Sequence, residues 1–359
     1  KLNPNAIVVA TGCYVQTSEE QGVTDNCVDV VSGNNRKKDL IEILEQHISK
    51  AIIDINHTNE YEKMHLTKTG EHTRAYIKVQ DGCNQFCTYC IIPYARGRVR
   101  SRLKQDVLNE VRDLARNGYK EVVLTGIHLS SYGVDLEHEN LLSLICAVHE
   151  IEGIERIRLG SLEPRIITEE FAQTLASLPK VCAHFHLSLQ SGCNETLRRM
   201  NRRYTAEEYY EKCQLLRKYF ANPALTTDVI VGFPGETEEE FAMSKAFVDK
   251  VDFYETHIFK YSKRQGTKAA TMEHQIPDSV KTSRSNQMLD MDKTKREKYE
   301  SNWIGKDVEV LVEEQIMREG KPYQVGHTKE YIKVLIDSEE SLQNQFLTVH
   351  LKDNSQIIH

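Results

Sequence analysis

Three cysteines, Cys83, Cys87 and Cys90, lie in one short stretch of this 359-residue chain, directly after a glycine. Thiolates this close in sequence can converge on one small cofactor, and iron–sulfur clusters are normally held by four such thiolates. The local set stops at three, which would leave one iron open to a substrate, much as catalytic zinc sites keep an open position. The C-x₃-C-x₂-C spacing differs from that of ferredoxins. A zinc loop or a chance group of cysteines is the alternative, although no histidine lies nearby to complete a zinc tetrahedron.

Composition limits the class of protein that can carry this loop. Nine cysteines is an odd number in a long chain, which argues against a disulfide framework and for a reducing compartment. No apolar run approaches the roughly 18 residues of a membrane span, and no signal peptide opens the sequence. We therefore expect a soluble cytoplasmic protein of two or three domains. Its net charge of −7 means that nucleic-acid binding would depend on local basic patches.

The elements that must position the cysteines form a regular alternation from residue 74 onward. Strands are predicted at 75–79, 121–125, 156–159, 184–189, 227–231 and 256–259. Helices are predicted between them at 104–117, 140–150, 168–177, 205–220 and 237–250. Six such repeats demand parallel strands with right-handed crossovers, hence an α/β fold with a full or partial (βα)6 barrel. In such barrels the chemistry sits at the carboxyl ends of the strands, and the cysteines follow the first strand.

The flanking segments differ in character from the barrel. Residues 6–10 predict a buried strand that runs into a turn at Cys13, and we interpret 1–50 as the remnant of a domain whose first part is missing, with a helix at 39–50. Residues 51–70 have the composition of a linker, and 71–298 form the barrel domain with a final charged helix at 279–302. Short strands at 307–312, 323–326, 332–336 and 346–351 predict a small antiparallel barrel in 299–359, acidic in composition.

Polar motifs occupy the other strand ends. Glycines there allow a ligand to approach the backbone, and nearby polar side chains can hydrogen-bond it. The candidates for ligand contact are Gly126, Ser161, Glu163, Gln190, Gly232 and Gly235. Glycine turns are also common strand exits, so each motif alone is a weak signal.

Two basic stretches lack acidic residues and predict phosphate contacts. Their candidate RNA-binding residues are Arg96, Arg98, Arg100, Arg102, Arg202 and Arg203. Tyr94 and Tyr204 lie beside them and are suited to stacking on bases. A solvated helix face is the alternative for either stretch.

Together these motifs give the chain a resemblance to the radical S-adenosylmethionine (SAM) methylthiotransferase family, most similar to the branch that acts on threonylcarbamoyladenosine in tRNA. The matching segments are 10–16, 79–102, 124–133, 158–164, 187–192, 200–205, 227–237 and 261–267. Residues 326–328 and 331–334 resemble the TRAM domain of that family. The match covers nearly the whole chain.

The resemblance implies a role for each matched position. Cys83, Cys87 and Cys90 would hold a 4Fe–4S cluster that cleaves SAM to a 5′-deoxyadenosyl radical, with Tyr89 among the cofactor contacts. The radical would act at C2 of the modified adenine in a tRNA anticodon stem-loop. Cys13 matches the third ligand of a second 4Fe–4S cluster that supplies sulfur. An electron donor such as flavodoxin or ferredoxin and a monomeric state are also implied.

Some positions depart from the family pattern. The first two ligands of the second cluster would precede Lys1, so this chain alone is expected to cleave SAM without inserting sulfur. Cys27 matches no motif and is expected to be a buried thiol; Lys260 replaces a usual proline and has no interpretation. Structural roles are expected for Cys146, Cys182, Cys193 and Cys213, and His184 and His186 are expected as a polar pair inside the barrel.

Three alternatives remain open at this point. The isopentenyladenosine-directed and ribosomal-protein-directed branches of the family share the cysteines and the barrel, and a non-catalytic RNA-binding relative would keep the same fold.

Overall fold

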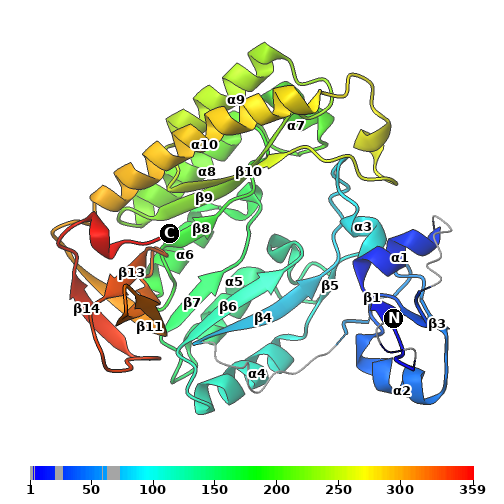
Figure 1. Cartoon of the computed structure of the whole chain (residues 1–359), viewed down its shortest axis with the longest axis horizontal. Helices are drawn as coiled ribbons and strands as arrows, with labels where there is room; N and C mark the ends of the chain where they lie inside the picture. Colours follow the sequence, from blue (N-terminus) through cyan, green and yellow to red (C-terminus); the bar gives the residue numbers. More distant parts are fainter. Residues whose placement is uncertain (1–2, 4, 21–26, 59, 63–72) are drawn as a thin grey trace.

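The central domain is an open barrel of parallel strands. The computed structural model describes residues 3, 5–20, 27–58, 60–62 and 73–359. Within them, the barrel strands are β4 (Arg74–Asp81), β6 (Glu121–Gly126), β7 (Arg156–Leu159), β8 (His184–His186), β9 (Ala224–Val231) and β10 (Glu255–Lys260). The orders β4-β6-β7 and β8-β9-β10 are joined by parallel bridges between Ile157 and Val181 and between Leu162 and Leu187. The predicted partial (βα)6 barrel is therefore confirmed (Figure 1).

Helices cover the outer face of the barrel. They are α4 (Lys104–Arg116), α5 (Leu141–His149), α6 (Glu169–Ser177), α8 (Ala206–Tyr219) and α9 (Glu238–Val251). Thr205 and Thr237 each start a helix with a capping box, at the positions where the sequence analysis began these two helices. Alternate strand residues such as Ile77 and Val79 are buried against these helices. A short helix that the sequence analysis did not predict, α7 (Asn194–Arg199), follows β8.

A four-stranded antiparallel sheet ends the chain, after the long helix α10 (Asp278–Ser301). Its order is β13-β12-β11-β14, with bounds Lys333–Ile336, Lys321–His327, Asp307–Arg318 and Phe346–His350. This sheet matches the predicted small antiparallel unit. It lies at the amino-terminal ends of β4, β6 and β7 (Figure 1). There Arg156 donates to the His327 carbonyl at 2.8 Å, Arg158 donates to the Thr328 carbonyl at 3.1 Å, and Arg74 pairs with Glu313 at 2.9 Å.

The amino-terminal unit holds a small parallel sheet of β1 (Val9–Thr11), β2 (Val30–Ser32) and β3 (Lys50–Ala51). Three expectations are corrected here. The first strand is partly exposed rather than buried, the expected turn at Cys13 is the helix α1 (Cys13–Glu20), and the helix expected at 39–50 spans only α2 (Leu40–Glu45), preceded by the 3₁₀ turn Lys37–Asp39.

The segment expected as a linker, 51–70, contacts both of its neighbours in its described part. The hydroxyl of Tyr61 donates to the Lys78 carbonyl on β4 at 2.6 Å, and the carboxylate of Glu62 accepts from the backbone N–H of Lys38 at 3.0 Å. Residues 63–70 lie outside the described residues. In the described chain no helix is both long and apolar enough to cross a membrane.

Candidate functional site

The cysteine loop, residues 82–91, begins where β4 ends. Gly82 has a φ of 71°, and a Cβ there would lie 1.8 Å from the Arg98 carbonyl oxygen, so only glycine fits this close approach. Its N–H donates to Asp81 Oδ1 at 2.8 Å, and the N–H of Cys83 donates to the Gly97 carbonyl at 3.0 Å. After the loop come α3 (Ile92–Ala95) and the short strand β5 (Arg100–Ser101), which pairs with β4. The loop is thereby fixed at both ends.

Two of the three thiols are buried, and Cys90 is partly buried. Cys83 and Cys87 are each 9% exposed, and burial raises the pKa of Cys83 and raises that of Cys90 to about 11. The charges of Cys83 and Cys87 also raise the pKa of Cys90, which shows that the three groups are close enough to repel one another as thiolates. A positively charged or metallic group between them would relieve that repulsion.

Two of the thiols accept hydrogen bonds from N–H groups. The backbone N–H of Gln85 donates to Cys83 Sγ at 3.5 Å, and the guanidinium of Arg202 donates to Cys87 Sγ at 3.3 Å. The backbone of Ile92 acts on Cys90 in the same sense, by lowering its pKa against the larger effect of burial. Donors of this kind stabilise sulfur ligands of iron–sulfur clusters. Among the described residues no group of three or more His, Cys, Asp or Glu side chains is arranged for a single metal ion. A cluster makes a different demand because each thiolate binds a separate iron, so this donor set fits a cluster.

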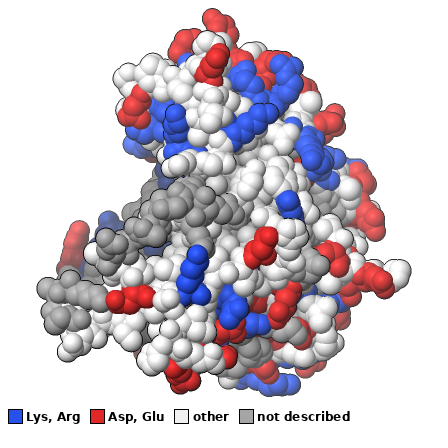
Figure 2. Space-filling view, turned by 90° about the vertical axis from the view of Figure 1, so that its right-hand side faces the viewer, with Lys and Arg blue, Asp and Glu red and all other residues white. Residues whose placement is uncertain are grey.

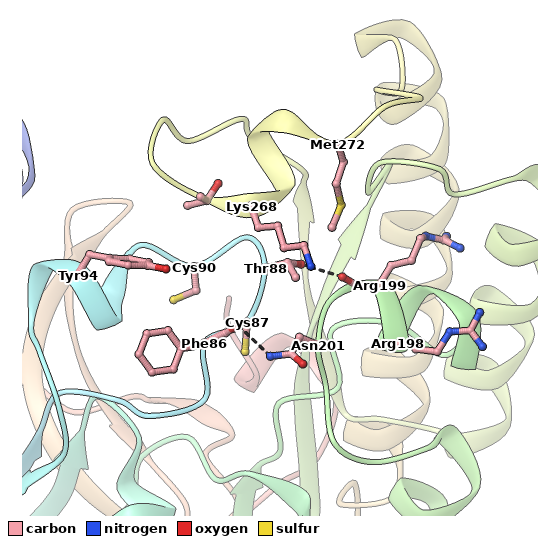
Figure 3. Close-up of a pocket in the computed structure, with 11 residues that line it drawn as sticks. Phe86, Cys87, Thr88, Cys90, Tyr94, Arg198, Arg199, Asn201, Lys268 and Met272 are labelled. Carbon is pink, nitrogen blue, oxygen red and sulfur yellow. Dashed lines mark hydrogen bonds between the residues drawn. The ribbon is translucent and has the colours of Figure 1, made fainter. Parts of the chain in front are cut away.

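A second segment, residues 199–202 at the end of α7, supports the cysteine loop. The Thr88 N–H donates to the Met200 carbonyl at 3.1 Å, and its hydroxyl donates to the Arg199 carbonyl at 2.9 Å. The Asn201 amide donates to the carbonyls of Phe86 at 3.0 Å and Gln85 at 3.3 Å. Figure 3 shows this supporting segment facing the loop. Sequence reasoning assigned Arg202 of this segment to RNA and missed the contact with the cysteine loop, although the match at 200–205 pointed to the segment.

Two cavities flank the loop. The outer cavity, of about 550 Å³, is lined by Cys87 and Cys90 together with Arg198 and Lys268 (Figure 3). The barrel cavity, of about 420 Å³, is lined by Cys90 and by barrel residues that include Asp228 on β9. A molecule in the barrel cavity would therefore contact the cysteine loop from inside the barrel.

The predicted cofactor-contact residues divide between two positions. Tyr89 and Gln190 line the barrel cavity beside Cys90. The others lie at strand ends and do not line this cavity. Ser161 is exposed, and Glu163 is buried and paired with Arg165 at 2.6 Å. The three glycines lie close to other side chains: Gly126 to Gln80, Gly232 to Lys281 and Gly235 to Arg199. Tyr89 and Gln190 are thus the members of the set that the fold brings to the cysteines.

The structure separates the predicted RNA-binding arginines into buried and exposed groups. Arg100 is 1% exposed and donates to the Arg96 carbonyl at 2.9 Å, and Arg102 is 4% exposed and pairs with Glu110 at 2.5 Å. Their guanidinium groups stabilise the region around β5 and do not face solvent. Arg98 and Arg203 are exposed.

Arg96 and Arg202 instead donate to cysteine sulfurs. The Nε of Arg96 donates to Cys13 Sγ at 3.1 Å, and one Nη of the same guanidinium lies 3.7 Å from Asp81 Oδ2. Cys13 also accepts from the Asn34 amide at 3.5 Å, and this amide donates to the Ala95 carbonyl at 2.6 Å. These contacts connect the amino-terminal unit to the start of the cysteine loop.

The remaining cysteines and histidines are mostly where the sequence placed them. Cys182, Cys193 and Cys213 are buried and Cys146 is partly buried, but Cys27 is exposed, so its expectation as a buried thiol was wrong. His186 pairs with Asp228 at 3.2 Å and stacks on His257, while burial holds the pKa of His184 well below its usual range. Lys260 lies 3.5 Å from Asp278 on α10.

Comparison with known proteins shows the family to which the chain belongs. The Radical SAM superfamily model matches residues 77–248. The chain is 37% identical to the threonylcarbamoyladenosine tRNA methylthiotransferase MtaB of Bacillus subtilis (strain 168), over 98% of this chain and 79% of that protein. It is 34% identical to the tRNA-2-methylthio-N(6)-dimethylallyladenosine synthase of Finegoldia magna, over 98% of this chain and 77% of that protein.

The fold has a counterpart among solved structures. The radical SAM methyltransferase TsrM from Kitasatospora setae, with cobalamin and a [4Fe-4S] cluster bound, superposes with a TM-score of 0.56 at 16% identity, over 74% of this chain and 57% of that chain. At this identity the likeness concerns the fold alone. The sequence relatives carry the assignment further: the chain belongs to the radical SAM tRNA methylthiotransferase family.

Proposed function

We propose that this protein adds a methylthio group to C2 of N6-threonylcarbamoyladenosine next to the tRNA anticodon. The observation that carries the proposal is the cysteine loop: two buried thiols that accept N–H hydrogen bonds and a third, partly buried thiol that lines a cavity of the barrel. The 37% identity to an MtaB protein over nearly the whole chain supports the threonylcarbamoyl substrate.

The residues of the site have separate tasks in this proposal. Cys83, Cys87 and Cys90 would hold a 4Fe–4S cluster. That cluster, when bound and reduced by a donor such as flavodoxin or ferredoxin, supplies the electron that splits SAM into methionine and a carbon radical. Tyr89 and Gln190 would bind and orient SAM in the barrel cavity.

Cys13 would be one thiolate ligand of a second cluster that supplies the sulfur. The position of Cys13 supports this role. Arg96 contacts both Cys13 and Asp81, and Asp81 immediately precedes the cysteine loop. The Cys13 thiol therefore lies on the side of the loop that faces the amino-terminal unit.

Exposed cations near the barrel mouth would bind the tRNA backbone. Arg98 and Arg203 remain from the predicted set, and the loop after β10 adds the exposed residues Lys263, Arg264 and Lys268. Figure 2 shows Lys and Arg side chains gathered on the upper part of this face, where that loop lies. Because phosphate contacts release counterions, affinity for an anticodon stem-loop should fall steeply as salt is raised.

Two deletion hosts distinguish the substrates. The gene is expressed in one bacterial strain that lacks its own MtaB-type enzyme and in another that lacks the dimethylallyladenosine enzyme, and tRNA nucleosides are analysed by mass spectrometry. Restoration of the methylthio-threonylcarbamoyl nucleoside in the first strain alone is the expected result. Restoration in the second strain alone would reassign the substrate to the dimethylallyl, or isopentenyl, nucleoside.

Anaerobic reconstitution with iron and sulfide tests the chemistry itself. The reconstituted protein should cleave SAM after reduction, and a Cys87→Ala variant should not, while Cys213→Ala, which removes a buried thiol far from the loop in sequence, should retain the activity. A wild-type protein that binds tRNA but assembles no SAM-cleaving cluster would point to a non-catalytic RNA-binding relative.

A further inference from the structure

Arg202 differs from the other arginines of the basic stretches because its guanidinium contacts a cysteine of the loop. One Nη donates to Cys87 Sγ at 3.3 Å, Nε donates to the Tyr204 hydroxyl at 2.9 Å, and the other Nη donates to the Ser188 carbonyl at 3.3 Å. The guanidinium also lies 5.0 Å from the centre of the Tyr204 ring. All of its nitrogen atoms thus have a partner, which fixes the side chain in one orientation.

The guanidinium of Arg202 lies against groups that differ in the charge they can carry. Arginine stays protonated in proteins, and a charge largely removed from water is costly unless an opposite charge compensates it. Tyr204 and Tyr89 act on this guanidinium but are neutral at physiological pH, and the thiols of the cysteine loop act on it as well. Of these thiols, Cys87 accepts a hydrogen bond from Arg202, so its thiolate, when bound to iron, would lie directly against the cation.

The orientation of Arg202 is set by the residue before it. Asn201 has a φ of 59°, the left-handed conformation that asparagine tolerates better than most residues, and its amide donates to the carbonyl of Phe86, directly before Cys87. The chain therefore leaves α7, bonds the cysteine loop, and then directs the next side chain at a sulfur. This order of contacts argues for a built arrangement.

We propose that Arg202 is a positioning residue that holds the Cys87 thiolate through a charged hydrogen bond and raises the reduction potential of the cluster which that thiolate binds. The inference rests on the proposed function and assigns a task within its site. Reduction adds one negative charge to the cluster, and a cation that donates to a ligand sulfur stabilises the more negative state. Arg202 would thus make the cluster easier to reduce, and it is unavailable to RNA phosphates.

Its exposed neighbour Arg203 provides a matched control. Arg202→Gln, Arg202→Lys and Arg203→Gln are reconstituted anaerobically in the full chain, and the midpoint potential of each cluster is measured by electron paramagnetic resonance during a redox titration without SAM. The potential of Arg202→Gln should shift to more negative values than that of wild type. Arg202→Lys, which keeps the charge, should recover part of the shift, and Arg203→Gln should match wild type.

The outcomes separate this inference from its competitors. A wild-type potential in Arg202→Gln overturns the proposal, and a wild-type potential combined with weaker SAM binding would assign Arg202 to the SAM carboxylate instead. If Arg202→Gln assembles no cluster, Arg202→Lys decides: a shifted potential supports the proposal, and an unshifted one overturns it. If neither Arg202→Gln nor Arg202→Lys assembles a cluster, and both variants melt at the wild-type temperature, the result supports the proposal that Arg202 holds the Cys87 thiolate. A wild-type protein without a SAM-cleaving cluster would count against the proposed function itself.

Discussion

Replacing Asn201 by alanine should loosen the cysteine loop while the barrel stays folded. The change removes two hydrogen bonds, to the carbonyls of Phe86 and Gln85, each worth about 0.5 kcal/mol or slightly more at this exposed position. It also places alanine at a φ of 59°, which costs about 1 kcal/mol. The total of about 2 kcal/mol corresponds to a roughly 30-fold rise in the population of the open loop.

Alkylation of the cluster-free protein measures this opening. The buried thiols of Cys83 and Cys87 react when the loop opens, and their rates follow the opening equilibrium when reclosing is fast. Peptide mass spectrometry should show about 30-fold faster labelling in Asn201→Ala. Asn201→Gly, which tolerates the left-handed φ and loses only the hydrogen bonds, should show a roughly 5-fold increase.

Asn222 supplies the control for backbone strain. It also has a left-handed φ, 51°, in the turn before β9, so Asn222→Ala pays the same conformational cost without touching the cysteine loop. It should leave the labelling of Cys83 unchanged, and Cys213 in the core should stay unreactive in all variants. Labelling of Cys83 within 3-fold of wild type in Asn201→Ala, or a parallel rise at Cys213, would refute the supporting role of residues 199–202.

Three further predictions concern other contacts. Arg156→Met should lower the free energy of unfolding in urea by about 3–5 kcal/mol, because it removes a buried cation that donates to two carbonyls of the terminal sheet. The exposed control Arg116→Met should change the free energy of unfolding by less than about 0.5 kcal/mol. Similar values for the two variants would contradict this account. Burial raises the pKa of Glu300 to about 7, above its ordinary value of 4.5, so its contribution to stability is full below pH 4.5 and is lost as pH rises to about 7. Glu300→Gln should flatten the stability profile between about pH 4.5 and 7, and an unchanged slope there would exclude this group. Arg96→Gln should speed alkylation of Cys13 without affecting the melting temperature of the barrel, and unchanged labelling would argue against its hydrogen bond.

Local signals explain why the barrel could be predicted from sequence. Each strand is a short apolar run, and helices such as α8 and α9 start at threonines whose hydroxyl and partner glutamate satisfy the first backbone N–H groups. The strand Arg156–Leu159 was predicted with the bounds observed. The cysteine spacing is equally local, because all three thiols belong to one loop. Sequential order then placed that loop at the carboxyl end of the first barrel strand.

Long-range pairing explains what the sequence did not show. Arg102 lies in a stretch without acidic residues, yet its partner Glu110 comes from the next helix, and Arg96 faces a cysteine 83 positions away. A basic run looks solvent-exposed until the fold supplies such partners. The helix α7 has only six residues, too few to show a periodic apolar stripe, so the helix itself was not predicted, although the family match at 200–205 marked the segment that follows it.

The attachment of the terminal sheet to the barrel has a consequence for how an RNA would be selected. Arg156 and Arg158 fasten this sheet to the strand starts, while the cysteine loop lies at the end of β4. The span between the two is then a fixed length, set by buried cations and backbone oxygens. An RNA that touched both the terminal sheet and the cysteine loop would have to span this fixed distance. The nucleotide that reaches the cysteine loop would then be selected by its distance from the part of the RNA bound at the terminal sheet.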